Sequence, residues 1–208
     1  MPGRFITLEG GEGVGKSTQA RALAAALRTR GIDVVETREP GGSDGAEAIR
    51  RLLLEGGADR WSARAEALLF AAARADHVEK TIKPAISQGR WVICDRFLDS
   101  SLAYQGGASG LGADRIRTLH DIGSEGFLPD RTLLLTLPSP AALVRAAERD
   151  GEGADRIGGR DARYHERVAA MFDQLASASP DRIRRIDAAG TPPAVTGRLL
   201  DALADLLP

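Results

Sequence analysis

The sequence predicts an α/β protein of three layers, in which a five-stranded parallel sheet lies between two layers of helices. Two observations lead to this prediction. Short β-prone apolar runs alternate with Ala- and Leu-rich stretches along the 208 residues, which is the pattern of repeated strand–helix units. A glycine-rich loop at residues 10–15 follows the first apolar run and precedes the first Ala-rich stretch, as at the turn from a parallel strand into a helix.

Residues 10–18 fit G-x-x-x-x-G-K-[ST], the pattern of a loop that binds nucleotide phosphates. Glycines let the backbone approach a phosphate closely, and its N–H groups and the dipole of the following helix then favour the anion. Lys16 supplies a charge for the β- and γ-phosphates, and Ser17 supplies a hydroxyl for Mg²⁺. Because a strand-like run (residues 4–9) and a helix-like run flank the motif, a chance Gly-rich turn is the less favoured interpretation. The expected ATP-binding residues are Gly10, Gly11, Glu12, Gly13, Val14, Gly15, Lys16, Ser17 and Thr18.

The remaining elements follow from periodicity and from turn and cap residues. Further strands are expected at residues 32–37, 91–94, 132–137 and 183–186. Helices are expected at about residues 20–27, 46–54, 63–79, 100–104, 140–148, 161–176 and 193–206. Ser62 is the expected N-cap of the helix at 63–79, and Asp114 is that of a further helix after a Gly-rich loop at 106–112.

Composition limits the class of protein. With 208 residues, 43% of them hydrophobic, the chain predicts a single domain, 1–208, with a sizeable core. A net charge of −1 argues against nucleic acid or an anionic membrane as a partner. Cys94 is the sole cysteine, so no intramolecular disulfide can form, and no apolar run is long enough to span a bilayer. Since the N-terminus enters the first strand without a leader segment, we expect a soluble cytoplasmic protein.

Polar residues gather at three expected strand ends. In open parallel sheets, active groups lie beyond the carboxyl ends of the strands. Here these ends carry the phosphate loop, residues 37–42 (Thr-Arg-Glu-Pro-Gly-Gly) and residues 95–105, which begin Asp-Arg-Phe. We therefore expect all three segments to line one crevice.

These segments carry a resemblance that extends over essentially the whole chain. The chain resembles the bacterial thymidylate kinases, which belong to the P-loop nucleoside monophosphate kinases. The resemblance implies a P-loop NTPase fold with a small mobile lid at about residues 149–160. It also implies transfer of the γ-phosphate of ATP to dTMP, giving dTDP and ADP for dTTP synthesis, by a homodimer. The segments that carry it, besides the phosphate loop, are residues 38–42, 70–74, 95–97, 100–107, 129–130 and 155–157.

Phosphoryl transfer requires positioning and charge neutralisation, and the residues after the third expected strand can supply both. Arg96 is placed for a bidentate clamp on the acceptor phosphate, and Asp95 for a water-mediated hold on Mg²⁺. The alternative is an ordinary Asp95–Arg96 salt bridge, which the opposite orientation of adjacent strand residues disfavours. The resemblance assigns both roles to the matching positions. The expected metal-binding residues are therefore Ser17 and Asp95.

Glu12 is an unusual residue for a phosphate-binding loop, because a carboxylate repels the triphosphate unless it points away. By the resemblance, Glu12 faces the acceptor and accepts a hydrogen bond from the deoxyribose 3′-hydroxyl. Some relatives carry an arginine at the position of Gly13, so here arginines of the lid are expected to stabilise the transition state. The lid candidates are Arg145, Arg149, Arg156 and Arg160, and the alternative is a solvated basic loop. The expected catalytic residues are Lys16, Arg96, Glu12, Arg149 and Arg156.

The resemblance also suggests how the base is read. Phe70 and Arg74 lie on one face of a helix; the ring stacks on the pyrimidine, and the guanidinium donates to O4 of thymine, which disfavours cytosine. Without the resemblance, Phe70 would be taken as a core residue. Ser101 and Gln105 complete the base-edge contacts, and Tyr104 packs beneath the sugar, leaving no room for a 2′-hydroxyl. The expected dTMP-binding residues are Glu12, Arg38, Pro40, Arg50, Phe70, Arg74, Arg96, Ser100, Ser101, Tyr104 and Gln105.

Two smaller expectations concern proline and histidine. The resemblance predicts a cis peptide bond before Pro40 and brings Arg50 near the acceptor phosphate. His77, His120 and His165 have no spacing typical of a metal site or a catalytic triad, so they are read as residues without a role in chemistry. Covalent catalysis is not expected.

Two other classes of protein share the phosphate loop. A guanine-nucleotide switch requires an Asn-Lys-x-Asp signature, which cannot occur because the chain has no Asn. A kinase for another nucleotide, a nucleoside or shikimate is compatible with the loop alone. The Phe70 and Arg74 pair and the segment 100–105 argue against it. ATP consumption measured with different acceptors distinguishes these classes.

Overall fold

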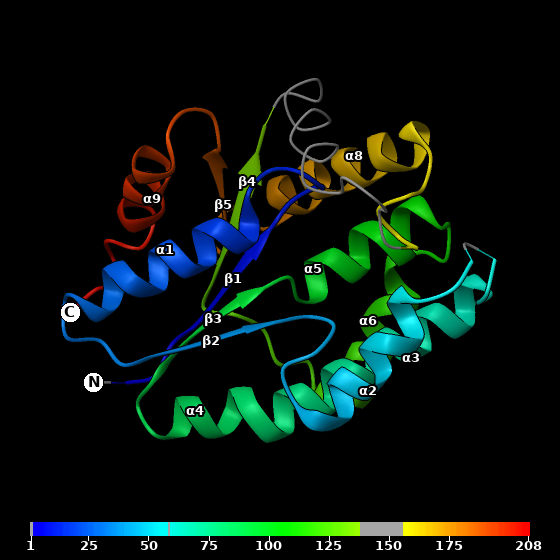
Figure 1. Ribbon diagram of the computed structural model, residues 1–208, viewed down its shortest axis with the longest axis horizontal. Helices are drawn as coiled ribbons and strands as arrows, with labels where there is room; N and C mark the ends of the chain where they lie inside the picture. The colour runs from blue at the N-terminus through cyan, green and yellow to red at the C-terminus, as the bar shows by residue number, and fades with distance from the viewer. Residues whose placement is uncertain (1, 58, 138–155) are drawn as a thin grey trace.

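The computed structural model describes residues 2–57, 59–137 and 156–208, and Figure 1 shows its ribbon. Within these residues, five strands form one sheet in which every pairing is parallel, as expected. Their order is β2-β3-β1-β4-β5, so β1 is central and lies between β3 and β4. The strands are β1 (Phe5–Glu9), β2 (Val34–Arg38), β3 (Trp91–Asp95), β4 (Arg131–Thr136) and β5 (Ile183–Asp187).

The central strands are almost continuous apolar runs because helices cover both faces of the sheet. All residues of β1 are buried, and in β3 only the last residue, Asp95, is partly exposed. In the register between the two strands, Leu8 pairs with Asp95. The loops that follow β1 and β3 therefore leave the sheet at the same level.

Helices cover the two faces of the sheet unequally (Figure 1). On one face, α1 (Lys16–Arg28) and α9 (Pro192–Asp201) pack against a core that contains Ile93 of β3. On the other face, α3 (Ala63–His77), α6 (Ala113–Ser124) and α8 (Ala162–Ala178) lie over a core that contains Phe5 and Leu134. This arrangement confirms the expected three-layer fold.

The strand connections open a crevice at one edge of the sheet. The chain passes from β1 into α1 on one face, and from β3 into α5 (Leu98–Ser101) and the π-helix η2 (Leu102–Ala108) on the other. Because the connections after these two neighbouring strands leave toward opposite faces, the loops at their carboxyl ends lie apart. Ligands bind in the crevice between such loops. After β2, α2 (Asp44–Leu54) begins at Ser43, whose hydroxyl accepts the N–H of Ala46.

The long helix expected at 63–79 exists, but it is not uniform. Ser62 caps α3 as expected, since its hydroxyl accepts the N–H of Ala65. After α3 the chain makes a π-helical turn, η1 (Val78–Ile82), and continues as α4 (Lys83–Ser87). Pro84 lies at the start of α4 and has no N–H to donate into the preceding turn, so the regular α-helical bonding cannot continue there.

Two local expectations were wrong. Part of the loop expected at 106–112 belongs to η2, and its glycines serve close packing: a Cβ on Gly106 would lie 3.4 Å from a side chain of α6, and one on Gly107 2.8 Å from a side chain of α8. The N-cap of α6 is Gly112, at a φ of 89°, and not Asp114. Asp114 lies in the first turn, where its charge favours the helix dipole.

The remaining boundaries differ from expectation by a few residues. The last helix was expected to reach 206, but α9 ends at Asp201 and turns follow it. The helix expected at 140–148 and most of the lid expected at 149–160 lie outside the described residues, which resume at Arg156. Of the helices in the described part of the chain, none combines the length and the apolar character that a bilayer span requires.

Candidate active site

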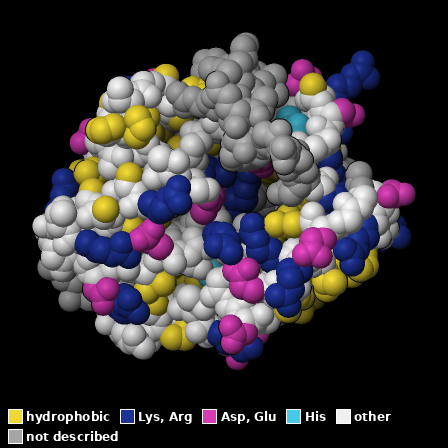
Figure 2. Space-filling view, viewed as in Figure 1, with side chains coloured by type: hydrophobic (Ala, Val, Ile, Leu, Met, Phe, Trp, Pro, Cys, Tyr) yellow, Lys and Arg dark blue, Asp and Glu magenta, His cyan; other side chains and the backbone are white. Residues whose placement is uncertain are grey.

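A cavity of about 990 Å³ opens beyond the carboxyl ends of β1, β2 and β3. In the space-filling view of Figure 2, Lys and Arg side chains gather in a hollow near the centre of the molecule. Its acidic lining residues in the described chain are Glu12, Glu39 and Asp95. Its basic lining residues are Lys16, Arg21, Arg38, Arg50, Arg74 and Arg96. The three polar strand ends therefore meet in one site, as expected, and the excess of cations favours phosphate groups.

The phosphate loop has the backbone that its glycines permit. Gly10, Gly13 and Gly15 have φ angles of 137°, 72° and 93°, which residues with a Cβ rarely adopt. A Cβ on Gly10 would also lie 2.5 Å from the carbonyl oxygen of Leu135 on β4. Since α1 begins at Lys16, the unpaired N–H groups of its first turn and its dipole face the loop.

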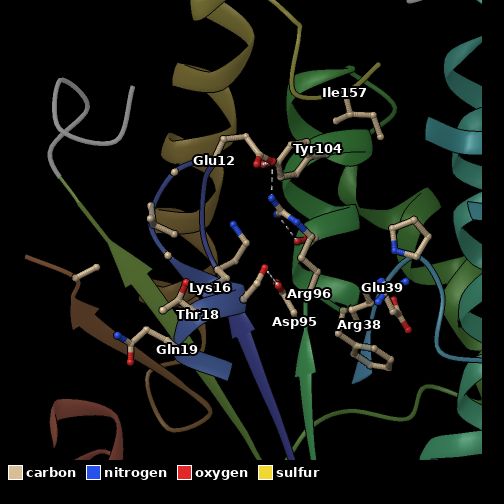
Figure 3. A pocket seen from close by; sticks show the side chains of 18 of the residues that line it. Glu12, Lys16, Thr18, Gln19, Arg38, Glu39, Asp95, Arg96, Tyr104 and Ile157 are labelled. Carbon is tan, nitrogen blue, oxygen red and sulfur yellow. Dashed lines mark hydrogen bonds and ion pairs between the residues drawn. The ribbon is translucent and has the colours of Figure 1, made fainter. Parts of the chain in front are cut away.

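Lys16 is a buried cation, with 6% of its surface exposed. Its ammonium donates a 2.5 Å hydrogen bond to the carbonyl of Gly11. Burial disfavours the charged form and Arg96 repels it, so its pKa falls to about 8 although Glu12 and Asp95 act in the opposite direction. Figure 3 shows Lys16 pointing into the space between the loop and Arg96. A phosphate in that space would compensate both positive charges.

Asp95 and Ser17 form a pair suited to a hard cation. The Ser17 hydroxyl donates a 2.5 Å hydrogen bond to Asp95 Oδ2, whereas Asp95 Oδ1 is buried and accepts no hydrogen bond from any described residue. A buried carboxylate oxygen without a partner is costly, and a cation with oxygen ligands satisfies it. No group of three or more His, Cys, Asp or Glu side chains able to hold a metal occurs among the described residues. The pair therefore fits Mg²⁺ held mainly through substrate phosphates and water.

Arg96 joins the phosphate loop to the opposite side of the cavity (Figure 3). Its backbone has a φ of 71°, a left-handed conformation uncommon for a residue with a side chain. One guanidinium nitrogen donates 3.1 Å hydrogen bonds to the Gly10 carbonyl and the Ser100 hydroxyl, and the other pairs with Glu12 Oε1 at 2.5 Å. The Tyr104 hydroxyl donates to the same Glu12 oxygen at 3.1 Å. Asp95 and Arg96 therefore bind other partners and do not form the alternative salt bridge with each other.

The cluster of Glu12, Arg96 and Tyr104 has a defined charge distribution. The guanidinium of Arg96 lies 5.1 Å from the centre of the Tyr104 ring. Burial acts against the charge on Arg96, but the neighbouring Tyr104, Glu12 and Asp95 raise its pKa overall. Burial also raises the pKa of Tyr104, which keeps its hydroxyl a neutral donor. The Glu12 carboxylate is thus directed at Arg96 and Tyr104.

Glu9, at the end of β1, is a buried acid that the sequence reasoning passed over. Its carboxylate accepts hydrogen bonds from the backbone N–H groups of Phe97 (2.7 Å) and Ser100 (3.2 Å) and a 2.5 Å bond from the Ser100 hydroxyl. Burial and the neighbouring Asp99 raise the pKa of Glu9 to about 8. Glu9 therefore holds the turn that carries Arg96. An acid at the end of an otherwise apolar strand was the only signal for it.

Arg74 reaches the cavity through a network of buried polar groups. Its guanidinium donates to Glu39 at 2.8 Å, to the Ser101 hydroxyl at 2.8 Å and to the carbonyl of Phe97 at 3.1 Å. The other oxygen of Glu39 lies 3.1 Å from Nδ1 of His77. His77 is fully buried, so it supports Glu39, and through it Arg74, by packing and hydrogen bonding.

The segment around Pro40 forms the adjoining wall of the cavity. The Glu39–Pro40 peptide bond is cis, as predicted. Arg50 donates a 2.6 Å hydrogen bond to the Pro40 carbonyl, and Arg38 pairs with Glu47 at 3.2 Å. Phe70 is half-buried: it lines the cavity and also packs against the core.

The end of the expected lid is anchored to α2 and α3. The Arg156 side chain is fully buried; it pairs with Glu66 of α3 at 2.6 Å and donates to the Leu53 carbonyl at 2.8 Å. Glu66 also accepts a hydrogen bond from the amide of Gln105. Ile157, the residue after Arg156, lines the cavity. In the structure, the guanidinium of Arg156 pairs with Glu66, which is remote in sequence, and Arg156 is not among the residues that line the cavity.

The structure brings most expected site residues together at the cavity. Gly10 and Gly11 contribute carbonyls that bind Arg96 and Lys16 without lining it. Arg149 lies outside the described residues. The expected residues that line the cavity are Glu12, Gly13, Val14, Gly15, Lys16, Ser17, Thr18, Arg38, Pro40, Arg50, Phe70, Arg74, Asp95, Arg96, Ser100, Ser101, Tyr104 and Gln105.

The strand order, the phosphate loop on the central strand and the arginine-lined wall facing it define a P-loop kinase of nucleotides. The family model for thymidylate kinase matches residues 8–196. The chain thus belongs to the thymidylate kinase family, and it is an ATP-dependent kinase that phosphorylates dTMP to dTDP.

Individual relatives agree with the family match over the whole chain. A thymidylate kinase of Rhizorhabdus wittichii is 72% identical over 208 residues, covering 100% of both chains. A thymidylate kinase of Gluconobacter oxydans is 52% identical over 207 residues, covering 99% of this chain and 96% of the relative. The crystal structure of thymidylate kinase from Ehrlichia chaffeensis superimposes with a TM-score of 0.78 at 31% identity, covering 98% of this chain and 100% of that chain.

Proposed function

We propose that the phosphate loop, residues 10–18, binds the triphosphate of ATP, with Lys16 at the β- and γ-phosphates. Ser17 and Asp95 hold Mg²⁺, Asp95 through water. When bound, Mg²⁺ would neutralise negative charge on the substrate phosphates. The buried Asp95 Oδ1, which no described residue satisfies, supports this assignment.

The acceptor side is built on Arg96, and the cluster that it forms is the observation that carries the proposal. Arg96 holds the dTMP phosphate near the γ-phosphate, because it lies near Lys16 and its bonds to the Gly10 carbonyl and the Glu12 carboxylate fix its position. Glu12 accepts the 3′-hydroxyl of the deoxyribose, and Tyr104 packs beneath the sugar. The proposal is supported by the ion pair between the Glu12 carboxylate of the phosphate loop and Arg96 of the opposite wall, since both residues line one cavity.

The base is read by the wall formed by α3 and η2. Arg74 donates to O4 of thymine, and its bonds to Glu39 and Ser101 hold it in place for this role. Phe70 stacks on the ring, and Gln105 contacts the base edge. The remaining proposed dTMP-binding residues, all at the cavity wall, are Arg38, Pro40, Arg50 and Ser100.

Transition-state charge is stabilised by arginines as well as by Lys16. We assign this role to Arg149 of the lid at about residues 149–160, since Gly13 leaves the phosphate loop without an arginine. Arg156 was expected to act in the same way. Its buried pairing with Glu66 supports an anchoring role at the end of the lid instead.

A panel of acceptors tests these assignments. ATP consumption should be rapid with dTMP, slower with dUMP and hardly measurable with dCMP or dGMP. Arg74→Ala should chiefly reduce the preference for dTMP over dCMP, because it removes the donor to O4. Slow turnover whatever the monophosphate would indicate a nucleotide switch. Unchanged relative rates in Arg74→Ala would remove Arg74 from the base site.

The assembly and the setting of the enzyme are further proposals. We infer a homodimer in the cytoplasm that binds no nucleic acid, in keeping with the net charge of −1. Leu68 on α3 and Ile122 on α6 are 56% and 78% exposed, and these two helices pack against each other. Sedimentation should therefore give a dimer for the native chain and a smaller species for Ile122→Asp. A monomeric native chain would contradict the proposal.

A further inference from the structure

Glu66 of α3 is a buried carboxylate with no role in the assignments above. Only 1% of its surface is exposed. Its Oε2 receives Arg156 at 2.6 Å and Arg160 at 2.7 Å, and its Oε1 receives the amide nitrogen of Gln105 at 2.9 Å. Two guanidinium groups that donate to one carboxylate favour its charged, hydrogen-bond-accepting form.

The contact with Glu66 determines which way the Gln105 amide faces. An ionised carboxylate only accepts hydrogen bonds, so Gln105 must turn its NH₂ group toward it. The carbonyl oxygen is then at the other end of the planar amide, and the hydrogen bonds of the described residues leave it uncommitted. Gln105 lines the cavity next to Tyr104. The polar group that it offers to a ligand is therefore an acceptor.

We propose that Glu66 is a positioning residue that selects the acceptor base through Gln105. Thymine carries an acceptor at O4 and a donor at N3, whereas cytosine carries a donor and an acceptor at the same two places. Arg74 supplies the donor for O4, and Gln105, held by Glu66, supplies the acceptor for N3–H. This inference rests on the proposed contact of Gln105 with the base.

The carboxylate is needed because an amide by itself has no fixed polarity. The two ends of a glutamine amide have nearly the same shape, so a free Gln105 could turn over and donate to N3 of cytosine. Glu66 is in turn fixed by its arginines. Arg156 also donates to the Leu53 carbonyl, and Arg160 to the Ser109 hydroxyl. Contacts with the segments around Leu53 and Ser109 thus fix the two arginines. These arginines in turn hold the Glu66 carboxylate, which orients the Gln105 amide.

A double-mutant cycle of Glu66→Gln and Gln105→Leu tests the proposal. The measured quantity is the ratio of kcat/KM for dTMP to that for dCMP, which does not depend on the fraction of folded enzyme. Each single variant should lower the ratio by at least about tenfold, the scale of losing a required hydrogen bond. The double variant should fall no lower than Gln105→Leu alone, because Glu66 acts through Gln105.

Two controls separate this role from a structural one. The ratio for dTMP to dUMP should stay unchanged in every variant, since uracil and thymine share O4 and N3–H. Arg160→Gln removes one ion pair of Glu66 but not the contact with Gln105, so the dTMP to dCMP ratio should persist whatever happens to kcat. If Glu66→Gln does not fold, Glu66→Asp, which keeps the charge on a shorter side chain, should lower the dTMP to dCMP ratio.

The outcomes are distinguishable. An unchanged ratio in Gln105→Leu would show that Gln105 does not read the base, which contradicts the proposed function. A lowered ratio in Gln105→Leu with a native ratio in the Glu66 variant would overturn the inference alone. The inference would also be overturned if Glu66→Gln lowered the dTMP to dCMP ratio equally in the native chain and in Gln105→Leu. The carboxylate would then act on the ratio by a route other than Gln105.

Discussion

Lys16 and Arg96 lie on the two sides of the phosphate site. Burial and the charge of Arg96 lower the pKa of Lys16, whereas Tyr104 and Glu12 help to raise the pKa of Arg96. We predict that Lys16→Ala and Arg96→Ala each reduce kcat/KM by at least about a hundredfold, the scale of losing a preorganised charge contact. Lys80→Ala is the matched control, because this lysine is 60% exposed and pairs only with the nearby Asp76 among the described residues. Near-native kcat/KM in either site variant would contradict the role given to that residue.

Glu9 predicts a pH-dependent stability. Its pKa is raised from 4.5 to about 8, so between these values the folded state keeps a proton that the unfolded state has released. The stability contributed by this group is complete below pH 4.5 and is lost as the pH rises through 8. Glu9→Gln mimics the protonated acid and does not titrate.

A comparison of the native protein with Glu9→Gln isolates the contribution of Glu9 to the unfolding free energy. Native protein should lose on the order of 3 kcal/mol of unfolding free energy relative to Glu9→Gln between pH 5 and pH 8. Urea unfolding at several pH values measures the difference. If the two proteins lost stability in parallel with pH, Glu9 would be ionised in the folded state, and this would contradict its raised pKa.

At the scale of elements, the loop between β2 and α2 is fitted against α3. Gly42 has a φ of 90°, and a Cβ there would lie 2.3 Å from Nε2 of His77 and 2.4 Å from the Thr37 hydroxyl. Gly42→Ala should displace His77, which supports Glu39 and through it Arg74. We predict a loss of more than about 2 kcal/mol in unfolding free energy, together with a raised KM for dTMP.

Gly31 provides the matched control for this substitution. It has a similar φ of 79°, but a Cβ there would have no atom within 4 Å. Gly31→Ala should therefore cost only the left-handed backbone conformation, about 1 kcal/mol, and leave KM for dTMP unchanged. Equal effects of the two substitutions would show that the contact with His77 is unimportant.

For the whole molecule, one sheet joins two cores. The core under α1 and α9 contains Trp91, and the core on the other face contains Phe5, yet both residues belong to neighbouring paired strands. We predict that the chain unfolds as a single domain in one cooperative transition. In Trp61→Phe, fluorescence of the remaining Trp91 and far-UV circular dichroism should give the same urea midpoint. Separate midpoints would indicate two independently folding parts.

Several features of this fold are encoded in local patterns of the chain. Alternating apolar and Ala-rich runs predicted the five parallel strands and their helices, and the loop at residues 10–18 predicted the phosphate site. The loop, Asp95 and Arg96 were found because they stand at strand ends, where the edge of a parallel sheet gathers them. These signals are short in range, so they survive in a single sequence without any knowledge of packing.

Only the tertiary structure decided which charges are buried and with what partners. Glu66 meets Arg156 across 90 residues of sequence, and Glu9 meets Ser100 across 91. Glu66 does not differ in local pattern from an ordinary helix residue, and Glu9 is marked only by its place at the end of a buried strand. Their burial, and with it the pairing of Arg156 with Glu66, arises where separate elements pack together. Contacts of that range leave no periodic trace in the sequence.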